Sequence, residues 1–147
     1  MIALIARCFG PYPGCVLDVD GEEPQLRTPG DSFESCWIAE LDGRVVGCIA
    51  CHSHKLDDGT GALELKKLYI DANARGMGLA RRLIDLVEDR AHEVGARVID
   101  LWTDTRFTKA HAVYEHYGFV REAAERELGD LSETREYYFT KAMPKTA

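Results

Sequence analysis

The most informative part of the sequence is residues 62–80, which read ALELKKLYIDANARGMGLA. Residues 63–70 form an apolar-rich run of strand length, and residues 77–94 place their apolar side chains at helical spacing. Gly76 and Gly78 lie at the start of the helical run and lack a Cβ atom, so the backbone there can approach an anion closely. Because a helix N-terminus has unpaired N–H groups and a partial positive charge, this stretch predicts a phosphate-binding turn between a strand and a helix.

The residues alone leave other roles possible for Gly76 and Gly78. A P-loop requires Gly-Lys-Ser/Thr, and this chain reads Gly-Leu-Ala at residues 78–80, which excludes that motif. A dinucleotide-binding turn requires a small residue where Arg81 stands, and its first glycine follows the strand almost directly, whereas five residues separate Ile70 from Gly76. Asp100 lies roughly where the ribose-binding acid would fall, so this interpretation stays as a weaker alternative. A purely structural role, as a tight strand-to-helix connection, is the other alternative.

Outside this stretch, the pattern of apolar and turn-forming residues predicts alternating strands and helices. Asp42-Gly43 lies between two β-rich runs and is the strongest short-range signal for a hairpin, whereas residues 18–35 have the composition of a loop. In chain order, the expected elements are a helix end at 2–9, strands at 36–41, 44–51 and 63–70, a helix at 77–94, a strand at 97–103, a helix at 108–117, and strands near 119–122 and 136–141. This order predicts a mixed sheet with helices packed on it, formed by a single domain over residues 1–147.

The composition argues against several classes of protein. The formal net charge of −7 disfavours nucleic acid as a partner, because a phosphate backbone requires a basic footprint. The five cysteines all lie within residues 8–51, and an odd, irregularly spaced set indicates free thiols in the reducing cytoplasm. No apolar run approaches the roughly 20 residues of a membrane helix, and residues 1–7 lack the basic leader of a signal peptide, so neither membrane insertion nor secretion is expected.

Two motifs resemble those of one enzyme family. Residues 75–80 contain the pattern Arg-x-x-Gly-x-Ala, which resembles the pyrophosphate-binding motif of the GNAT superfamily of CoA-dependent N-acyltransferases. Downstream, the sequence AHAVYEHYGF at residues 110–119 resembles the family's Ala-x-x-x-Tyr-x-x-x-Gly-Phe segment. The resemblance covers about residues 33–141 and is tightest over residues 62–119.

The resemblance implies an α/β (α+β) fold, with a GNAT-like mixed, mostly antiparallel central sheet flanked by helices. It also implies acetyl-CoA as the co-substrate and an amine as the acceptor, with no metal ion, and a homodimer is a family-level expectation. The family's fold usually begins with a strand before its first helix. This chain starts inside that helix, so the first strand is expected to be missing.

Cofactor-binding residues are carried over from the same resemblance. In the family, the strand equivalent to residues 68–70 bulges, and its backbone N–H groups face the pantetheine and the thioester carbonyl. Many relatives carry Asn seven residues before the tyrosine, where this chain has Phe107. The expected cofactor-binding residues are Leu68, Tyr69, Ile70, Arg75, Gly76, Met77, Gly78, Leu79, Ala80, Phe107 and Ala110.

Two residues are candidates for the proton transfers that acetylation of an amine requires. Tyr114 is the expected general acid, because a phenol with a pKa of ~10 can protonate a thiolate of similar basicity. Glu64 lies six residues before Ile70, where some family members keep a base glutamate, and it is the expected general base. The alternatives are a core tyrosine on one helix face, and a solvated glutamate that pairs with Lys66 or Lys67.

A second cluster of reactive side chains lies in the predicted hairpin. Residues 48–54, CIACHSH, contain typical zinc ligands. Strand periodicity, however, places positions 48, 52 and 54 on one face and Cys51 on the other, so no metal site is expected. His52 and His54 are candidates for lining the acceptor pocket instead.

Together, these features give one leading hypothesis and two alternatives. The leading hypothesis is an N-acetyltransferase that moves the acetyl group of acetyl-CoA to an amine of an unidentified small-molecule or protein acceptor. The alternatives are a non-catalytic acyl-CoA-binding module and a nucleotide-binding oxidoreductase. Thr103, Asp104 and Arg106 follow a strand, and they either contact a ligand or cap the next helix.

Overall fold

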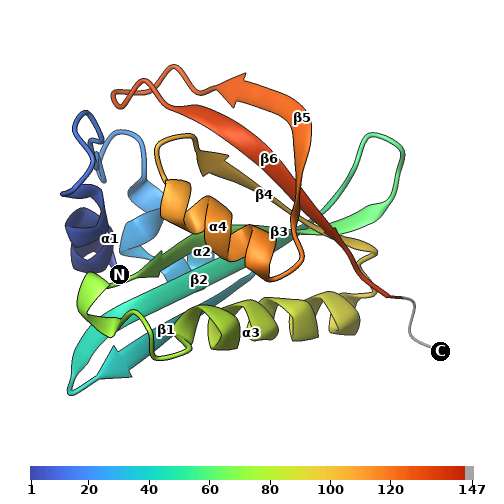
Figure 1. The fold of residues 1–147 in the computed structure, drawn as a ribbon, viewed down its shortest axis with the longest axis horizontal. Helices are drawn as coiled ribbons and strands as arrows, with labels where there is room; N and C mark the ends of the chain where they lie inside the picture. Colours follow the sequence, from blue (N-terminus) through green and yellow to red (C-terminus); the bar gives the residue numbers. More distant parts are fainter. Residues whose placement is uncertain (145–147) are drawn as a thin grey trace.

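A computed structural model describes residues 1–144 and contains one six-stranded sheet with helices on both faces (Figure 1). In chain order, the elements are α1 (Ile2–Phe9), the short 3₁₀ helix η1 (Pro24–Arg27), α2 (Pro29–Ser32), β1 (Ser35–Leu41), β2 (Arg44–Lys55), β3 (Gly61–Ile70), the short 3₁₀ helix η2 (Ala72–Ala74), α3 (Leu79–Val94), β4 (Val98–Asp104), α4 (Thr108–His116), β5 (Val120–Glu127) and β6 (Arg135–Ala142). None of the helices in these residues is both long and apolar enough to cross a membrane.

The strands lie in the order β1-β2-β3-β4-β6-β5. Every neighbouring pair is antiparallel except β3 and β4, which are parallel. The expected mixed, mostly antiparallel sheet is therefore confirmed. The first element is α1, and β1 forms one edge of the sheet.

The hairpin between β1 and β2 forms where the Asp-Gly pair predicts it. Asp42 and Gly43 have φ angles of 52° and 76°, so both central residues of the turn adopt the left-handed conformation that a tight hairpin requires. Glycine adopts this conformation without steric cost, and aspartate tolerates it better than most residues. The turn fixes the register in which Leu41 pairs with Arg44.

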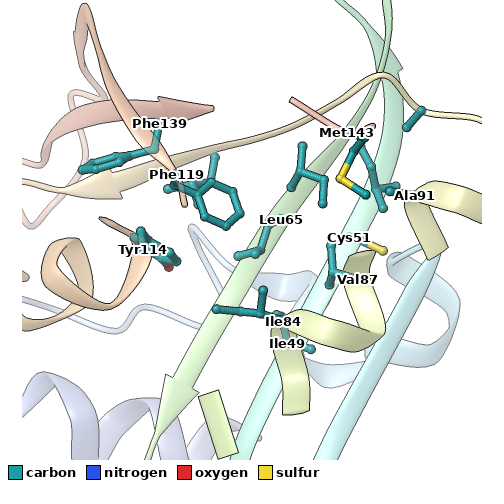
Figure 2. Packing of buried hydrophobic residues seen from close by; sticks show 14 of the residues in the cluster. Ile49, Cys51, Leu65, Ile84, Val87, Ala91, Tyr114, Phe119, Phe139 and Met143 are labelled. Carbon is teal, nitrogen blue, oxygen red and sulfur yellow. The ribbon is translucent and has the colours of Figure 1, made fainter. Parts of the chain in front are cut away.

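The main core lies between the sheet and the helices α3 and α4. Leu83, Ile84, Val87 and Ala91 are the buried residues of α3, and Figure 2 shows the last three beside side chains of the sheet. Their spacing of three to four residues places them on one face of the helix. The helix begins at residue 79 rather than at the predicted residue 77, because the glycine before it has a φ angle of 75° and cannot be helical.

A second, smaller core covers the opposite face of the sheet. Its buried residues are Ile5 of α1, Leu26 of η1, Phe33 and Ala50. The loop predicted for residues 18–35 therefore contains two short helices, and a buried leucine anchors it to the sheet. Residues 10–34 thus form one wall of the molecule beside β3, which places them next to the candidate site.

Strand β5 is longer than the sequence predicts, because no apolar alternation marks it. All eight of its residues are exposed, and five are charged. Its basic side chains stack on aromatic rings instead: the guanidinium of Arg121 lies 3.4 Å from the ring centre of Tyr137, and that of Arg126 lies 4.3 Å from Trp102. Period-2 hydrophobicity cannot identify a strand of this kind.

Asp71 ties the end of β3 to α1 and to the β1–β2 hairpin. Its carboxylate is buried and accepts hydrogen bonds from the N–H of Asn73 at 3.0 Å, from Nε of Arg7 at 2.9 Å and from the guanidinium of Arg44 at 3.4 Å. The Asn73 N–H, followed by the Arg7 guanidinium, holds the pKa of Asp71 below its usual range, although burial opposes this. The negative charge of Asp71 therefore stabilises the fold at neutral pH.

The variant Asp71→Asn is expected to lower the free energy of unfolding by about 1–2 kcal/mol at pH 7, because both arginines lose their anionic partner. A lowered pKa contributes stability above the unfolded-state value of ~3.9 and loses it as pH falls through the folded-state value, so the difference from wild type should become smaller in acid. Urea unfolding at pH 7 and pH 3 measures this. Asp85→Asn on the exposed face of α3 is the control, and an equal loss there would contradict the anchoring role.

Candidate active site

The parallel strands β3 and β4 separate soon after they pair. Their register covers only Ala62–Glu64 against Val98–Asp100, so β3 continues to Ile70 without β4 beside it. The remainder of this edge of β3 therefore carries backbone groups that face no partner strand. A backbone edge of this kind can donate hydrogen bonds to a bound molecule.

A β-bulge lies in the separated part of β3. Ala50 of β2 pairs with Lys66 and Cys48 pairs with Tyr69, so Ile49 opposes two residues of β3 instead of one. Lys67, inside the bulge, has a φ angle of 56°. A non-glycine residue in this left-handed region is strained, and the surrounding contacts must hold it there.

One contact that holds the bulge is an ion pair from the wall formed by residues 10–34. The Lys67 ammonium lies 2.8 Å from both carboxylate oxygens of Glu23, and both side chains are largely buried. The same carboxylate accepts a hydrogen bond from Gln25. The N-terminal segment therefore fixes the backbone at the position where β3 and β4 separate.

A cavity of about 360 Å³ lies on one side of the bulge, between β3, the start of α3 and α4. Ten of the eleven residues expected to bind the cofactor line it, which are Leu68, Tyr69, Ile70, Arg75, Gly76, Gly78, Leu79, Ala80, Phe107 and Ala110. Met77 does not, because its side chain points into solvent and is 54% exposed. The structure thus brings the turn and the bulged strand to one cavity.

The turn before α3 leaves open space where side chains would otherwise lie. Gly76 and Gly78 have φ angles of 80° and 75°, and no atom lies within 4 Å of the position that a Cβ would occupy at either residue. The sixteen-residue helix α3 begins directly afterwards, so its first N–H groups have no partner within the helix. This geometry suits a phosphate group, and Arg75 in the same cavity wall adds positive charge.

A second cavity, of about 430 Å³, adjoins the first. Leu68, Tyr69, Phe107 and Ala110 line both cavities, so the bulge and the start of α4 form their common wall. The catalytic candidates Glu64 and Tyr114 line the second cavity. The residues expected to bind the cofactor, except Met77, line the first cavity. The residues expected to transfer protons line the second cavity, and the common wall separates the two cavities.

Tyr114 is both a core residue and a cavity residue. It is only 5% exposed, and its ring packs against Phe119 and Phe139 at centroid distances of 5.8 and 5.9 Å (Figure 2). Burial raises the pKa of its phenol, so the hydroxyl keeps its proton at neutral pH. No hydrogen bond to this hydroxyl is found within residues 1–144, and its oxygen is not among the fully buried polar atoms that lack a partner, so it is accessible from the cavity. A protonated hydroxyl that faces a cavity without a protein partner is suited to donate to a bound molecule.

Glu64 lies in β3, between His52 of β2 and Asp100 of β4 in the register of the sheet. Its carboxylate lies 3.6 Å from the Lys66 ammonium, so the ion pair proposed as an alternative to catalysis does form. The distance is long for a charge-assisted hydrogen bond, and the side chain is 22% exposed. The carboxylate is therefore still available to accept a proton from the cavity side.

Asp100 has a role within the sheet that differs from ribose binding. The residue is 2% exposed, and its two carboxylate oxygens bond His54 at 2.8 Å and the Tyr138 hydroxyl at 2.7 Å. A ribose-binding acid must be accessible to its ligand. The structure therefore leaves the dinucleotide interpretation without its acid.

The two cysteines of β2 lie in the buried part of the strand, whereas His52 and His54 are partly exposed. Burial raises the pKa of Cys48 to about 12 and that of Cys51 to about 11, so both thiols are protonated and poor metal ligands. Within residues 1–144, no group of three or more His, Cys, Asp or Glu side chains is arranged to hold a metal ion. His52 packs against Phe33, and neither it nor His54 is among the residues that line the two cavities, so their expected role in the acceptor pocket is wrong.

The end of β4 contacts a cavity and does not cap a helix. Thr103 and Asp104, the last two residues of β4, line the second cavity. Arg106 lines neither cavity and binds the Asp104 carboxylate through Nε at 3.0 Å and a terminal nitrogen at 2.8 Å. The cap residue of α4 is Phe107, which makes no side-chain capping bond. The geometry therefore agrees with the ligand-facing interpretation for Thr103 and Asp104, but not for Arg106.

Several residues of the first cavity were not predicted from the sequence. They are Cys8, Tyr12, Ala74, Lys109, Val113 and Tyr117. Helical spacing from Ala110 is a signal that could have identified Val113 and Tyr117. Cys8 and Tyr12 carry no such signal, because α1 and the residues after it reach the cavity only through tertiary packing.

Comparison with known proteins agrees with this geometry. Residues 3–119 match the model of the acetyltransferase (GNAT) family. N-acetylaspartate synthetase of Rattus norvegicus is 33% identical over 111 residues, which cover 74% of this chain and 35% of that protein. The chain therefore spans about a third of the length of that relative.

Solved structures show the same fold at lower sequence identity. An acetyltransferase from Streptococcus agalactiae 2603 superposes with a TM-score of 0.77 at 22% identity and covers 96% of this chain and 88% of its own. A chain of the NatC complex bound to Gag peptide and CoA superposes with a TM-score of 0.69 at 18% identity and covers 97% and 91%. Since the family model spans most of the sequence, the chain belongs to the acetyltransferase (GNAT) family.

Proposed function

We propose that this chain is an N-acetyltransferase that binds acetyl-CoA in the first cavity and an amine in the second. The observation that carries the proposal is the common wall at the bulge, with the glycine turn on one side and Tyr114 on the other. Family membership supports the same chemistry, and the NatC complex, which contains a chain of the same fold, is bound to CoA. The acceptor is an amine of an unidentified small molecule or protein.

The first cavity fits the parts of acetyl-CoA. Arg75 and the first N–H groups of α3 would hold the pyrophosphate, which needs positive charge and hydrogen-bond donors. The mostly apolar wall from Leu68 to Ile70 would lie along the pantetheine. Phe107 stands where many relatives have Asn, so an aromatic ring replaces that polar side chain. The ring packs on Tyr12 at a centroid distance of 4.8 Å and would close this wall of the cavity.

The bulged part of β3 is proposed to orient the thioester. Its unpaired backbone N–H groups would donate hydrogen bonds to the thioester carbonyl, where negative charge develops as the amine attacks. Fixed donors of this kind typically contribute ~3–4 kcal/mol each to the stability of the transition state. The ion pair of Lys67 with Glu23 would keep those donors in place.

Two proton transfers complete the reaction. A new bond forms between the amine nitrogen and the acetyl carbon, and the bond between that carbon and the CoA sulfur breaks. We assign Glu64 to accept the proton of the amine, directly or through water, because an amine with a pKa of ~10 cannot attack while protonated. We assign Tyr114 to give a proton to the departing sulfur, which leaves free CoA thiol and an N-acetylated product.

We also propose where the chain acts and with which kinds of partner. All five cysteines are free, which supports a cytoplasmic location. The net charge of −7 supports a small molecule or protein, and not a nucleic acid, as the partner. We treat residues 1–147 as one domain, and a homodimer is proposed from the family alone.

Ligand-dependent stability tests the identity of the cofactor. Acetyl-CoA and CoA at about 100 times their dissociation constants should raise the melting temperature by roughly 5–11 °C, since binding to the native state adds about 2.7 kcal/mol. NAD and ATP at the same concentrations should have smaller effects. Stabilisation by NAD that equals or exceeds that by CoA would contradict the proposal. Stabilisation by acetyl-CoA without thiol release from any amine would favour the non-catalytic acyl-CoA-binding module.

A further inference from the structure

The charges that line the second cavity indicate which amines it accepts, and this inference rests on the function proposed above. Acidic side chains outnumber basic ones in its wall. The acidic residues are Glu22, Glu23, Glu64, Asp104, Asp130 and Glu136. The basic residues are Lys66, Lys67 and Arg126.

Each basic group in the wall already has an acidic partner in the same wall. The pairs are Lys67–Glu23, Lys66–Glu64 and Arg126–Glu136, with N···O distances of 2.8, 3.6 and 2.7 Å. The guanidinium of Arg126 also lies over the Trp102 ring at 4.3 Å. The charges of these pairs cancel, and a carboxylate on the acceptor would have to compete with an existing partner for each cation.

The remaining acids gather where two distant loops meet. The backbone N–H of Val16 donates to Ser132 at 2.7 Å, and the N–H of Leu131 donates to Glu22 at 2.9 Å, so residues 16–22 and 128–134 join at one end of the cavity. Figure 1 shows the turn between β5 and β6 reaching over the segment after α1 at this place. Glu22 and Asp130 both come from this junction.

The junction keeps an excess of negative charge. Hydrogen bonds from the N–H and hydroxyl of Thr134 hold the pKa of Asp130 below its usual range, although burial opposes them, so Asp130 is ionised at neutral pH. Arg106 brings positive charge, but its guanidinium is bound to Asp104 and to the carbonyl of Ser132 at 3.0 Å. Three carboxylates therefore face one guanidinium at this end of the cavity.

Tyr114 independently marks the part of the cavity where the reaction would occur. The residue is 5% exposed, its hydroxyl has no hydrogen-bond partner within residues 1–144, and it lies one helical turn after Ala110 of the common wall. An amine that reacts beside Tyr114 would extend its remaining atoms into the rest of the cavity, whose wall includes the acidic junction. We infer that the acceptor is an aliphatic primary amine with a second cationic group, as in a diamine, which the junction of Glu22 and Asp130 binds.

Three amines of equal chain length test the charge preference. Cadaverine carries a second ammonium, pentylamine carries none, and δ-aminovalerate carries a carboxylate instead. With acetyl-CoA saturating, thiol release should give kcat/KM in that order, with cadaverine about tenfold or more above δ-aminovalerate. The preference should shrink as salt is added, because the junction is partly open to solvent.

A matched pair of variants tests the location. Glu22→Gln removes one charge and keeps an oxygen that can accept from Leu131, so it should lower the preference for cadaverine over pentylamine about threefold. Glu125→Gln removes an exposed carboxylate of β5 that lines neither cavity, and it should change nothing. Equal effects of the two variants would overturn the inference.

The outcomes separate this inference from the proposed function. Equal or greater kcat/KM with pentylamine or δ-aminovalerate would overturn the inference while the acetyltransferase function stands. Thiol release with other amines but with none of these three would also overturn it. If no primary amine triggers thiol release, that result would contradict the proposed function itself.

Discussion

Tyr114→Phe is expected to lower the turnover number for acetyl transfer about 100- to 10,000-fold, the range that a positioned general acid contributes. The phenylalanine ring keeps the packing against Phe119 and Phe139, and the lost hydroxyl has no protein partner within the described residues. The melting temperature and the affinity for acetyl-CoA should therefore stay close to wild type. Steady-state thiol release, paired with a binding titration, measures both quantities.

The pH dependence separates Tyr114 from Glu64. Because burial raises the pKa of Tyr114, its hydroxyl stays protonated at every pH below the usual tyrosine pKa of ~10. The defect of Tyr114→Phe should therefore persist from pH 6 to about pH 9. Glu64→Gln should instead recover as pH rises, since the amine then loses its proton to solvent. Full activity of Tyr114→Phe at every pH would show that the acid assignment is wrong.

Gly78→Val is expected to weaken acetyl-CoA binding about 100-fold or more, which corresponds to about 2.7 kcal/mol. Gly78 has a φ angle of 75°, which a β-branched residue adopts only under strain. The new side chain would also enter the open space at the start of α3, where the pyrophosphate is proposed to lie. Isothermal titration with acetyl-CoA measures the change.

Gly59→Val provides the control for backbone strain. Gly59 has a φ angle of 85° and open space around its Cβ position, but it lies in the β2–β3 connection and lines neither cavity. Both variants should lose similar stability, by roughly 1–2 kcal/mol, whereas only Gly78→Val should lose affinity. Equal affinity of the two variants for acetyl-CoA would remove the turn from the binding site.

The fold could be predicted largely because its central elements are locally consistent. The Asp42-Gly43 turn, the apolar spacing of α3 and the positive φ of Gly95 at its end each carry a local signal that the structure confirms. The mostly antiparallel character of the sheet, by contrast, followed from the family resemblance, and the strand order was not predicted. Nothing in the sequence of β3 and β4 shows that they pair for only three residues and then separate.

The elements that sequence reasoning missed are those whose stability is not local. Strand β5 has no apolar face, and its basic residues stack on Tyr137 and Trp102 from neighbouring strands. The short helices in residues 18–35 are held by Leu26 against the second core. Neither kind of contact produces a periodic pattern of apolar residues in the sequence.

The candidate site also has some parts that carry a local sequence signal and others that form only through tertiary contacts. The turn at residues 75–80 and the helix bearing Tyr114 have spacings that a single sequence displays, and the structure places them at adjoining cavities. The ion pair of Lys67 with Glu23 joins residues 44 positions apart, and the junction of Ser132 with Val16 joins residues 116 apart. Contacts over such separations depend on the completed fold, so the acceptor side of the site could not be predicted.

An N-acetyltransferase must both bind acetyl-CoA and transfer its acetyl group to an amine. Both can be measured in one reaction with wild-type protein, acetyl-CoA and cadaverine, by quantifying free CoA thiol and N-acetylated amine together. We expect the two products to form in equal molar amounts, and Tyr114→Phe to form little of either. Thiol release without N-acetylated amine, or binding of acetyl-CoA with neither product from any primary amine, would contradict the proposed function.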